Sequence, residues 1–341
     1  MVEGVKLCNH CVRNINSPFV DSENWKCSFC IDFENHKERL FSRLKAVEGK
    51  FLDNIKRSPW KGIYDCIVLV SWWKDSIMTL YKIKKDTDLR ILAYTFDNWF
   101  ESEEALENIR KAVEKLEIDW MLDKPWYILK VLKVILMEKI PSSICRFCAP
   151  IMINRAIKKA KSDKIPYIVT WWNKWQSDRE PSRFPLWNIP KVKIRELLQK
   201  YPFLKNIWIE EQENEKLLKK YGIQTVSPWI HELRDTKAYT EIITRDLWWV
   251  MPKVSYPKES TNCVLNFLQV VLSRKYFGYT HYDCEESMLI NFKENSRENA
   301  QKILDADIDK EIIENILNKL SLKLEDIGLN EQQLAIYSKF Q

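Results

Sequence analysis

Residues 64–76 place a positive charge, a carboxylate and two hydroxyls directly after an apolar, β-branched run. The run ends at Val70, and Ser71, Lys74, Asp75 and Ser76 follow it. This pattern predicts a buried parallel strand that leads through a loop into a helix. Such loops hold anions in α/β proteins, because free backbone N–H groups and the helix dipole point at the ligand. The lysine adds a cation and the serines add donors, so these residues could bind phosphate.

Trp72 and Trp73 do not fit this interpretation, because a loop that surrounds phosphate with its backbone needs glycine. The composition is unusual in the same way. An average chain of this length has about 7% glycine, or roughly 24 residues. This chain has 6 Gly and 15 Trp, and its Trp outnumber both its 14 Phe and its 13 Tyr. Tryptophan also stands where turns favour glycine, as in Asn24-Trp25, Asn98-Trp99 and residues 170–173.

We therefore hypothesise that most tryptophans stand for glycine. This substitution arises when a genome that reads UGA as glycine is translated with a table that reads it as tryptophan. Trp208, Trp229 and one of Trp248 and Trp249 lie in apolar contexts and are expected to be genuine. The alternative is a truly tryptophan-rich protein whose loop binds no phosphate.

Cysteines form a second group of residues with chemical potential. Four of the nine form two Cys-x-x-Cys pairs near the amino terminus, separated by fifteen residues: Cys8, Cys11, Cys27 and Cys30. Four thiolates at this spacing can close a tetrahedral Zn²⁺ site in a segment too short to have another core. The spacing predicts a zinc ribbon, either purely structural or serving to dock RNA or a partner protein.

A third pair, Cys145 and Cys148, is expected to open a helix, where the positive helix end lowers thiol pKa values. Cys66 lies in the predicted buried strand and is expected to belong to the core. Paired cysteines of this kind favour metal or redox chemistry in a reducing compartment over disulfides. No apolar stretch is long enough to span a membrane and no signal-peptide pattern opens the sequence, so we expect a cytoplasmic protein.

Alternating strands and helices must position these groups. Strands are expected near residues 64–70, 90–96, 118–122, 166–170 and 223–226. Helices are expected at 76–85, 102–116 and 128–138, and a further helix follows the Cys145–Cys148 pair and ends at about residue 161. This order predicts an α/β fold with a doubly wound, mainly parallel, Rossmann-like sheet. The expected domains are a ribbon at 1–40, the α/β domain at 55–235 and a mostly helical region at 236–341.

With glycine at positions 72 and 73, the loop reads Ser-Gly-Gly-Lys-Asp-Ser and resembles the PP-loop of the N-type ATP pyrophosphatases. This family has the adenine nucleotide alpha hydrolase-like fold and includes tRNA-thiolation enzymes, tRNA-lysidine synthases and sugar amidotransferases. As printed, two of the six motif positions depart from the pattern. The resemblance implies an enzyme that splits ATP into AMP and pyrophosphate, with Mg²⁺, to adenylate a carbonyl oxygen of its substrate.

The same resemblance implies which residues contact ATP. The loop itself would hold the phosphates, with Asp75 contacting Mg²⁺, and the end of the second strand would hold the adenosine. The implied residues are Ser71, Trp72, Trp73, Lys74, Asp75 and Ser76, then Tyr94, Thr95 and Asp97, and then Thr170, Asn173, Lys174 and Gln176 in a second loop. Taken alone, Asp75 could also interact with the helix dipole and Asp97 could also form a turn.

In the thiolating enzymes, a Cys-x-x-Cys pair and one distant cysteine hold a [4Fe–4S] cluster. Here the resemblance implies Cys145, Cys148 and Cys263, which would leave one iron open to carry sulfide. Cys284 is a weaker candidate ligand. A second zinc site or buried thiols are the alternatives.

Three functions follow. Sulfur transfer, as in tRNA thiolation, rests on these three cysteines. Nitrogen transfer rests on the amino-acid sequence of the amino-terminal ribbon, which resembles that of N-acetyl sugar amidotransferases. If Trp72 and Trp73 are genuine, a non-catalytic binding module is expected instead. The acceptor would be a tRNA or an amino sugar, with a partner protein donating sulfide or ammonia. The net charge of +6 is compatible with an anionic partner. Whether the protein forms a homodimer is left open.

Overall fold

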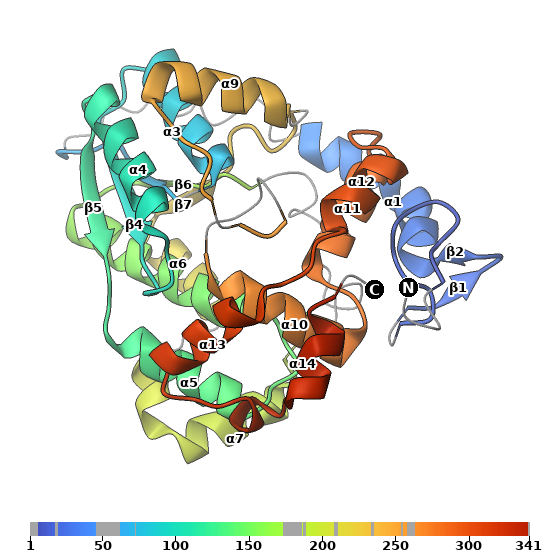
Figure 1. The fold of residues 1–341 in the computed structure, drawn as a ribbon. Helices are drawn as coiled ribbons and strands as arrows, with labels where there is room; N and C mark the ends of the chain where they lie inside the picture. The colour runs from blue at the N-terminus through green and yellow to red at the C-terminus, as the bar shows by residue number, and fades with distance from the viewer. Residues whose placement is uncertain are drawn as a thin grey trace.

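A five-stranded, fully parallel sheet forms the centre of the molecule (Figure 1). The computed structural model describes residues 6–17, 20–45, 62–71, 73–172, 186, 189–207, 211–232, 235–253, 255–257 and 263–339. The strands are β3 (Cys66–Leu69), β4 (Ile91–Phe96), β5 (Asp119–Asp123), β6 (Tyr167–Val169) and β7 (Gln224–Val226). Their order, β5-β4-β3-β6-β7, places the first strand of the sheet in the middle. The chain therefore winds outward on both sides of β3, and the predicted doubly wound α/β fold is confirmed.

The helices that follow the strands correspond closely to the sequence pattern. The expected helix at 76–85 begins two residues earlier, because Lys74 and Asp75 already form its first turn. Helices and 3-10 turns of the described chain are α3 (Lys74–Asp86), α4 (Glu103–Leu116), α5 (Tyr127–Met137), α6 (Cys145–Ser162), α7 (Lys191–Lys200), η3 (Pro202–Asn206), α8 (Glu211–Tyr221), α9 (Thr236–Leu247), α10 (Leu265–Phe277), α11 (His281–Asn291), α12 (Arg297–Leu304), α13 (Lys310–Lys319), η4 (Glu325–Ile327) and α14 (Glu331–Tyr337).

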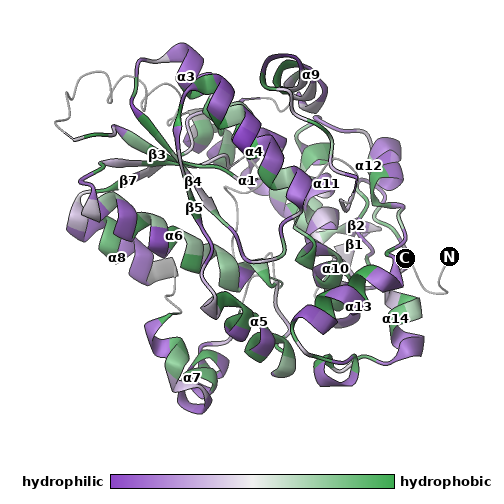
Figure 2. Ribbon diagram, turned by 60° about the vertical axis from the view of Figure 1, so that its left-hand side comes forward, coloured by the Kyte–Doolittle hydropathy of each residue, from purple (hydrophilic) through white to green (hydrophobic). Residues whose placement is uncertain are grey.

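The sheet separates two hydrophobic cores, as the alternation of side chains along a strand requires. Cys66, Val68 and Val70 face one core, which α3, α4 and α9 cover. Ile67 and Leu69 face the other, which includes α5, α6 and the carboxyl-terminal helices. Figure 2 shows helices on both sides of the sheet. Cys66 is fully buried in this arrangement, so its prediction as a core residue is confirmed.

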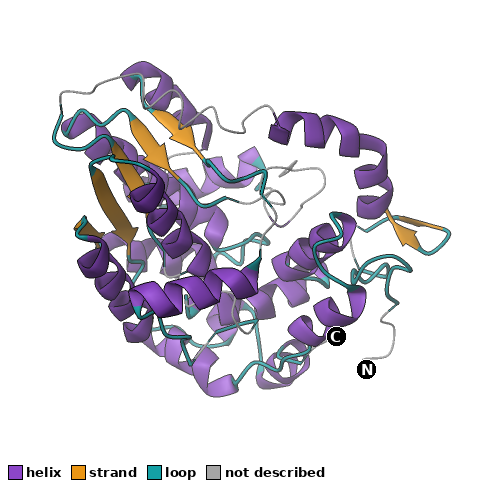
Figure 3. Cartoon of the chain, turned by 90° about the horizontal axis from the view of Figure 1, so that it is seen from above, coloured by secondary structure: helices purple, strands orange, loops and turns teal. Residues whose placement is uncertain are grey.

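The amino-terminal segment forms a small unit outside this sheet. Its hairpin, β1 (Ser22–Glu23) and β2 (Lys26–Cys27), leads into the long helix α1 (Ser28–Lys45) and lies apart from the five-stranded sheet (Figure 3). The unit contacts the carboxyl-terminal helices directly. The Ser17 hydroxyl donates to the Gly278 carbonyl at 2.9 Å, and the four ribbon cysteines share one buried cluster with residues of α10 and α11.

Arg13 lies at this contact and is fully buried. Its guanidinium carbon stands 3.4 Å from the centre of the Phe29 ring and 5.1 Å from that of Tyr279. None of its side-chain nitrogens has a hydrogen bond of regular geometry among the described residues. Burial alone would lower its pKa, but Cys284 and Tyr279, and after them Cys11 and Cys27, hold the pKa of Arg13 above the usual range. Arg13 thus joins the ribbon to α11 through stacking and electrostatics.

Among the helices that the structure describes, none combines the length and the apolar character needed to cross a membrane.

Candidate functional site

The loop that follows β3 lies at the carboxyl edge of the sheet, between β3 and β6. This is the point where the winding reverses, and α/β proteins bind ligands there. Lys74, Asp75 and Ser76 form the first turn of α3 and are buried. The Ser76 hydroxyl donates to the Trp73 carbonyl at 2.8 Å and to that of Ser71. The structure therefore brings the predicted phosphate-binding residues together at a helix amino terminus, where backbone N–H groups favour an anion.

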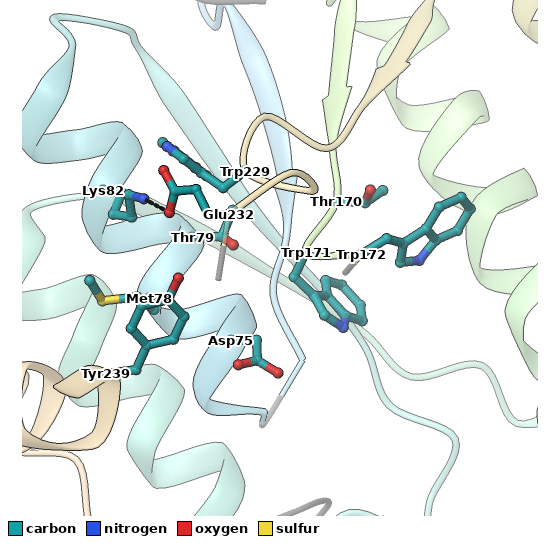
Figure 4. A pocket seen from close by; sticks show the side chains of 10 residues that line it. All are labelled: Asp75, Met78, Thr79, Lys82, Thr170, Trp171, Trp172, Trp229, Glu232 and Tyr239. Carbon is teal, nitrogen blue, oxygen red and sulfur yellow. Dashed lines mark hydrogen bonds and ion pairs between the residues drawn. The ribbon is translucent and has the colours of Figure 1, made fainter. Parts of the chain in front are cut away.

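A pocket opens beside this helix end (Figure 4). Asp75 lines it from α3, and Thr170 lines it from the end of β6. Three indoles, those of Trp171, Trp172 and Trp229, supply much of the remaining wall. Tryptophan side chains therefore occupy the position where the sequence analysis expects a glycine-rich second loop. Asn173, Lys174 and Gln176, the other predicted residues of that loop, lie outside the described residues, as does Trp72.

Thr170 itself is almost completely buried. Its hydroxyl lies 2.5 Å from that of Ser227, which follows β7. The side chain thus links two neighbouring strand ends. Trp171 and Trp172, which follow it in the chain, line the pocket with it.

The predicted adenosine residues are engaged within the protein. The Tyr94 hydroxyl donates to the Asp123 carboxylate, which also accepts hydrogen bonds from Arg155. The Thr95 hydroxyl donates to the Val70 carbonyl at 2.9 Å. Asp97 accepts a 2.6 Å hydrogen bond from the Trp99 amide and pairs with Lys124 at 2.6 Å. The turn interpretation of Asp97 therefore describes what this side chain does here, and none of the three lines the pocket beside α3.

Tryptophan occupies backbone conformations that favour glycine. Asn24 and Trp25 form the two-residue loop between β1 and β2 with φ of 48° and 66°, and this turn type prefers Asn-Gly. Trp99 has φ of 74°, and Trp248, with φ of 58°, ends α9 where glycine is the usual residue. Trp249, in contrast, is buried.

Three of the nine non-glycine residues with positive φ in the described chain are thus tryptophan, which supports the glycine hypothesis. Trp73 gives no such support, because its φ of −69° and ψ of 138° suit any residue.

Cys145, Cys148 and Cys263 come from distant segments and meet near the end of β4. The Asn98 side-chain amide, just beyond β4, donates to the Cys263 sulfur at 3.4 Å and also interacts with Cys148. The three thiols are close enough for Cys145 and Cys148 to influence the pKa of Cys263. Cys145 is exposed, and the other two are half-buried. This arrangement leaves the group accessible from one side.

The expected lowering of thiol pKa values at the start of α6 is wrong for Cys148. Its pKa is raised above the usual value, first because of the loss of hydration and second because of the nearby Cys145. The helix does begin at Cys145, as predicted. Desolvation outweighs the helix dipole here, because the dipole contributes at most about 2 kcal/mol even in partly buried geometries.

The sequence analysis did not find Glu101 and Asn98. Both follow β4 within a few residues, and Glu101 forms an isolated antiparallel bridge with Cys263. The pKa of the Glu101 carboxyl is raised by burial first and by Asp97 second. The sequence does show polar residues directly after a buried strand. Their proximity to Cys263 could not be predicted, because it depends on a backbone bridge between residues far apart in the sequence.

Donor chemistry distinguishes the two cysteine groups. Cys8, Cys11, Cys27 and Cys30 have all four sulfurs within 4.8 Å of one another, and Cys11 and Cys27 are 3.6 Å apart. Sulfurs bound to zinc at about 2.3 Å in a tetrahedron lie about 3.8 Å apart, so this group fits Zn²⁺. Cys145, Cys148 and Cys263 do not form such a compact group. Thiols with wider spacing fit a cluster of several irons better than a single ion. Cys284 belongs to neither set, since it lies beside Arg13.

No family model matches the chain. An uncharacterized protein of Methanocaldococcus jannaschii is 25% identical over 165 residues, which are 48% of this chain and 57% of that protein. The chain thus matches little more than half the length of this relative.

Two solved structures resemble the chain only weakly. The U34-tRNA thiolase NcsA from Methanococcus maripaludis, solved with its [4Fe–4S] cluster, has a TM-score of 0.40 and 12% identity, with 96% of this chain and 99% of that chain covered. The NH3-dependent NAD synthetase from Campylobacter jejuni has a TM-score of 0.31 and 13% identity, with 66% of this chain and 99% of that chain covered. Scores this low do not place the chain in a family.

Proposed function

We propose that the natural protein carries glycine at positions 72 and 73 and is a PP-loop ATP pyrophosphatase that transfers sulfur to an adenylated substrate. The main support is the meeting of Cys145, Cys148 and Cys263 at the edge of the sheet where the loop at 71–76 opens α3. Cysteines from two separate segments, at the same edge of the sheet as the amino terminus of α3, would combine the two functions that the reaction needs.

In the proposed reaction, the amino terminus of α3 and Lys74 would hold the β- and γ-phosphates of ATP, and Asp75 would contact Mg²⁺. A carbonyl oxygen of the substrate attacks the α-phosphorus. The bond to the bridging oxygen breaks, and pyrophosphate leaves. Sulfide then attacks the activated carbon, the carbon–oxygen bond breaks, and AMP leaves. No net oxidation or reduction occurs.

The three cysteines would hold a [4Fe–4S] cluster, which supplies one open iron for the sulfide when it is bound. The amide of Asn98 would orient the Cys263 sulfur, to which it already donates. The four-cysteine ribbon would hold Zn²⁺ in a purely structural role, because all four sulfurs are fully buried.

Sulfur transfer is favoured over nitrogen transfer by the position of Cys263. Had Cys263 been remote from Cys145 and Cys148, the cluster would have lacked a third ligand. Instead, Cys148 and Cys263 share the Asn98 amide, and Cys145 lies close enough to act on both thiols. Because the chain is mildly basic, a tRNA is the acceptor that we propose.

The test compares the printed chain with a form in which Trp72, Trp73, Trp171 and Trp172 are all glycine. Binding of labelled ATP is measured, and ATP–pyrophosphate exchange is measured with bulk tRNA as the acceptor, because exchange requires an acceptor that can be adenylated. We expect both in the glycine form alone, because the indoles of Trp171 and Trp172 line the candidate pocket. In that form, Lys74→Ala should lower exchange at least about a hundredfold, as loss of one electrostatic contact to reacting phosphate does.

Lys85→Ala is the matched control, because Lys85 is exposed at the far end of the same helix. Absence of ATP binding in the glycine form would remove the proposal and favour a non-catalytic binding module. Equal exchange by Lys74→Ala and Lys85→Ala would show that the loop is not the phosphate site. The mass of the natively expressed protein tests the glycine hypothesis independently.

A further inference from the structure

Glu101 shares one short backbone pairing with Cys263. The two residues form an isolated antiparallel bridge, and next to it the Val264 amide donates to the Phe100 carbonyl at 2.9 Å. Residues directly opposite each other in an antiparallel pair project to the same face. The carboxylate and the thiol therefore leave the backbone on the same side.

The Glu101 carboxyl group is buried against the Cys263 thiol. Neither of its oxygens is exposed or has a hydrogen bond of regular geometry among the described residues. The two nearby lysines are engaged elsewhere. Lys124 pairs with Asp97 at 2.6 Å, and Lys319 donates to the Trp99 carbonyl. A carboxyl group in such a place is neutral unless it is paired or bound to a metal.

The Asp97 carboxylate and cysteine thiols lie close to this carboxyl group. Cys263 lies near enough to lower the pKa of Glu101 by hydrogen bonding, and the Glu101 charge acts on both Cys148 and Cys263. The Asn98 amide lies between these two thiols. Cys148, Cys263 and Glu101 therefore gather beyond the end of β4, with Cys145 near the two thiols.

This inference rests on the proposed function. We propose that Glu101 is the fourth ligand of the cluster and binds the iron that Cys145, Cys148 and Cys263 leave open. Carboxylate oxygen is a harder ligand than thiolate and suits iron less strongly than sulfur does. Glu101 would therefore retain that iron in the resting protein and be displaced when sulfide arrives.

The test uses full-length protein reconstituted anaerobically with ⁵⁷Fe and sulfide. Parent, Glu101→Gln and Glu101→Ala are compared, and Glu104→Gln serves as the matched control because Glu104 is exposed three residues away. Mössbauer spectra of the parent and the control should show one iron with the higher isomer shift of oxygen ligation. In Glu101→Gln, water takes the place of the carboxylate, so the signal of this iron should be lost at a lower concentration of added hydrosulfide than in the parent.

A second readout is the loss of that iron when the cluster is oxidised by ferricyanide, followed by the EPR signal of the three-iron product. The two Glu101 variants should form this product about tenfold faster than parent and control, the order expected when support for a metal site is lost. They should also bind added hydrosulfide at lower concentration, since no carboxylate competes.

The results separate this inference from the proposed function. A parent cluster with no oxygen-ligated iron, and with iron loss equal to that of Glu101→Gln, overturns the role of Glu101 and leaves the sulfur-transfer proposal standing. A parent that assembles no cluster overturns both. Zinc content of the ribbon reports whether each variant is folded. If neither variant folds, the parent Mössbauer spectrum alone decides.

Discussion

The two cysteine groups of this molecule differ in how the chain builds them. The ribbon group comes from 23 consecutive residues, Cys8 to Cys30, and its sulfurs are fully buried. The second group joins α6 to Cys263, exposes Cys145, and includes an amide and a carboxylate. A closed set of four thiolates suits a structural metal, whereas an open set suits exchange of a ligand. The comparison predicts that the first metal stabilises the fold and the second takes part in chemistry.

The largest expected effect is that of removing the ribbon metal. Cys27→Ser should lose about one equivalent of zinc and unfold the ribbon, because zinc binding in such small units contributes about 10 kcal/mol or more. Zinc analysis and thermal melting measure both effects. Cys66→Ala is the control, since Cys66 is buried in β3 and belongs to neither group. A ribbon that melts like the parent without zinc would contradict the assigned structural role.

A second prediction concerns the open group. Cys263→Ser should abolish the broad visible absorbance of a reconstituted cluster, because two thiolates from α6 cannot hold it alone. The ribbon should keep its zinc and the protein its melting temperature within a few degrees. Unchanged absorbance would exclude Cys263 as a ligand. Simultaneous loss of zinc would show that the two groups are not independent.

The smallest expected effect comes from replacing tryptophans with positive φ. Trp25 lies in the ribbon, and Trp99 lies next to Asn98 beside the open cysteine group. Trp25→Gly should stabilise the ribbon by about 1–2 kcal/mol, the cost of a left-handed conformation for a residue with a side chain. Trp99→Gly should gain less, because the Trp99 ring lies 3.8 Å from that of Trp126 and donates to the Pro125 carbonyl. Urea unfolding measures both changes. Trp249→Gly, at a buried position, should destabilise and serves as the control.

Local pattern explains what could be predicted from sequence. The buried strand β3, the Ser102 cap of α4 and the spacing of the ribbon cysteines are each encoded within a few residues. Tyr94 shows the limit of this approach. A strand end was expected to face adenosine, but alternation along β4 directs the hydroxyl to Asp123 on the neighbouring strand.

The open site depends on pairing between remote segments. Asn98 and Cys263 are 165 residues apart in sequence, and Glu101 meets Cys263 through one isolated bridge. No motif marks such a contact. The desolvation of Cys148 could not be predicted from the sequence either, because it depends on which segments cover the start of α6. Sequence indicated the three cysteines, and the fold added the polar groups around them.

Arg13 has a consequence for how this protein can be divided and recombined. A zinc ion with four thiolates would leave an excess of two negative charges, and the buried guanidinium would compensate part of it from between Phe29 and Tyr279. Because Tyr279 lies two residues before α11, this compensation would link the ribbon to the carboxyl-terminal helices. The ribbon therefore cannot be transferred to another protein as an independent unit. A chimaera that exchanges residues 1–40 for another ribbon would lose Arg13 and its contact with Tyr279. The new ribbon would have to supply a cation at the same place.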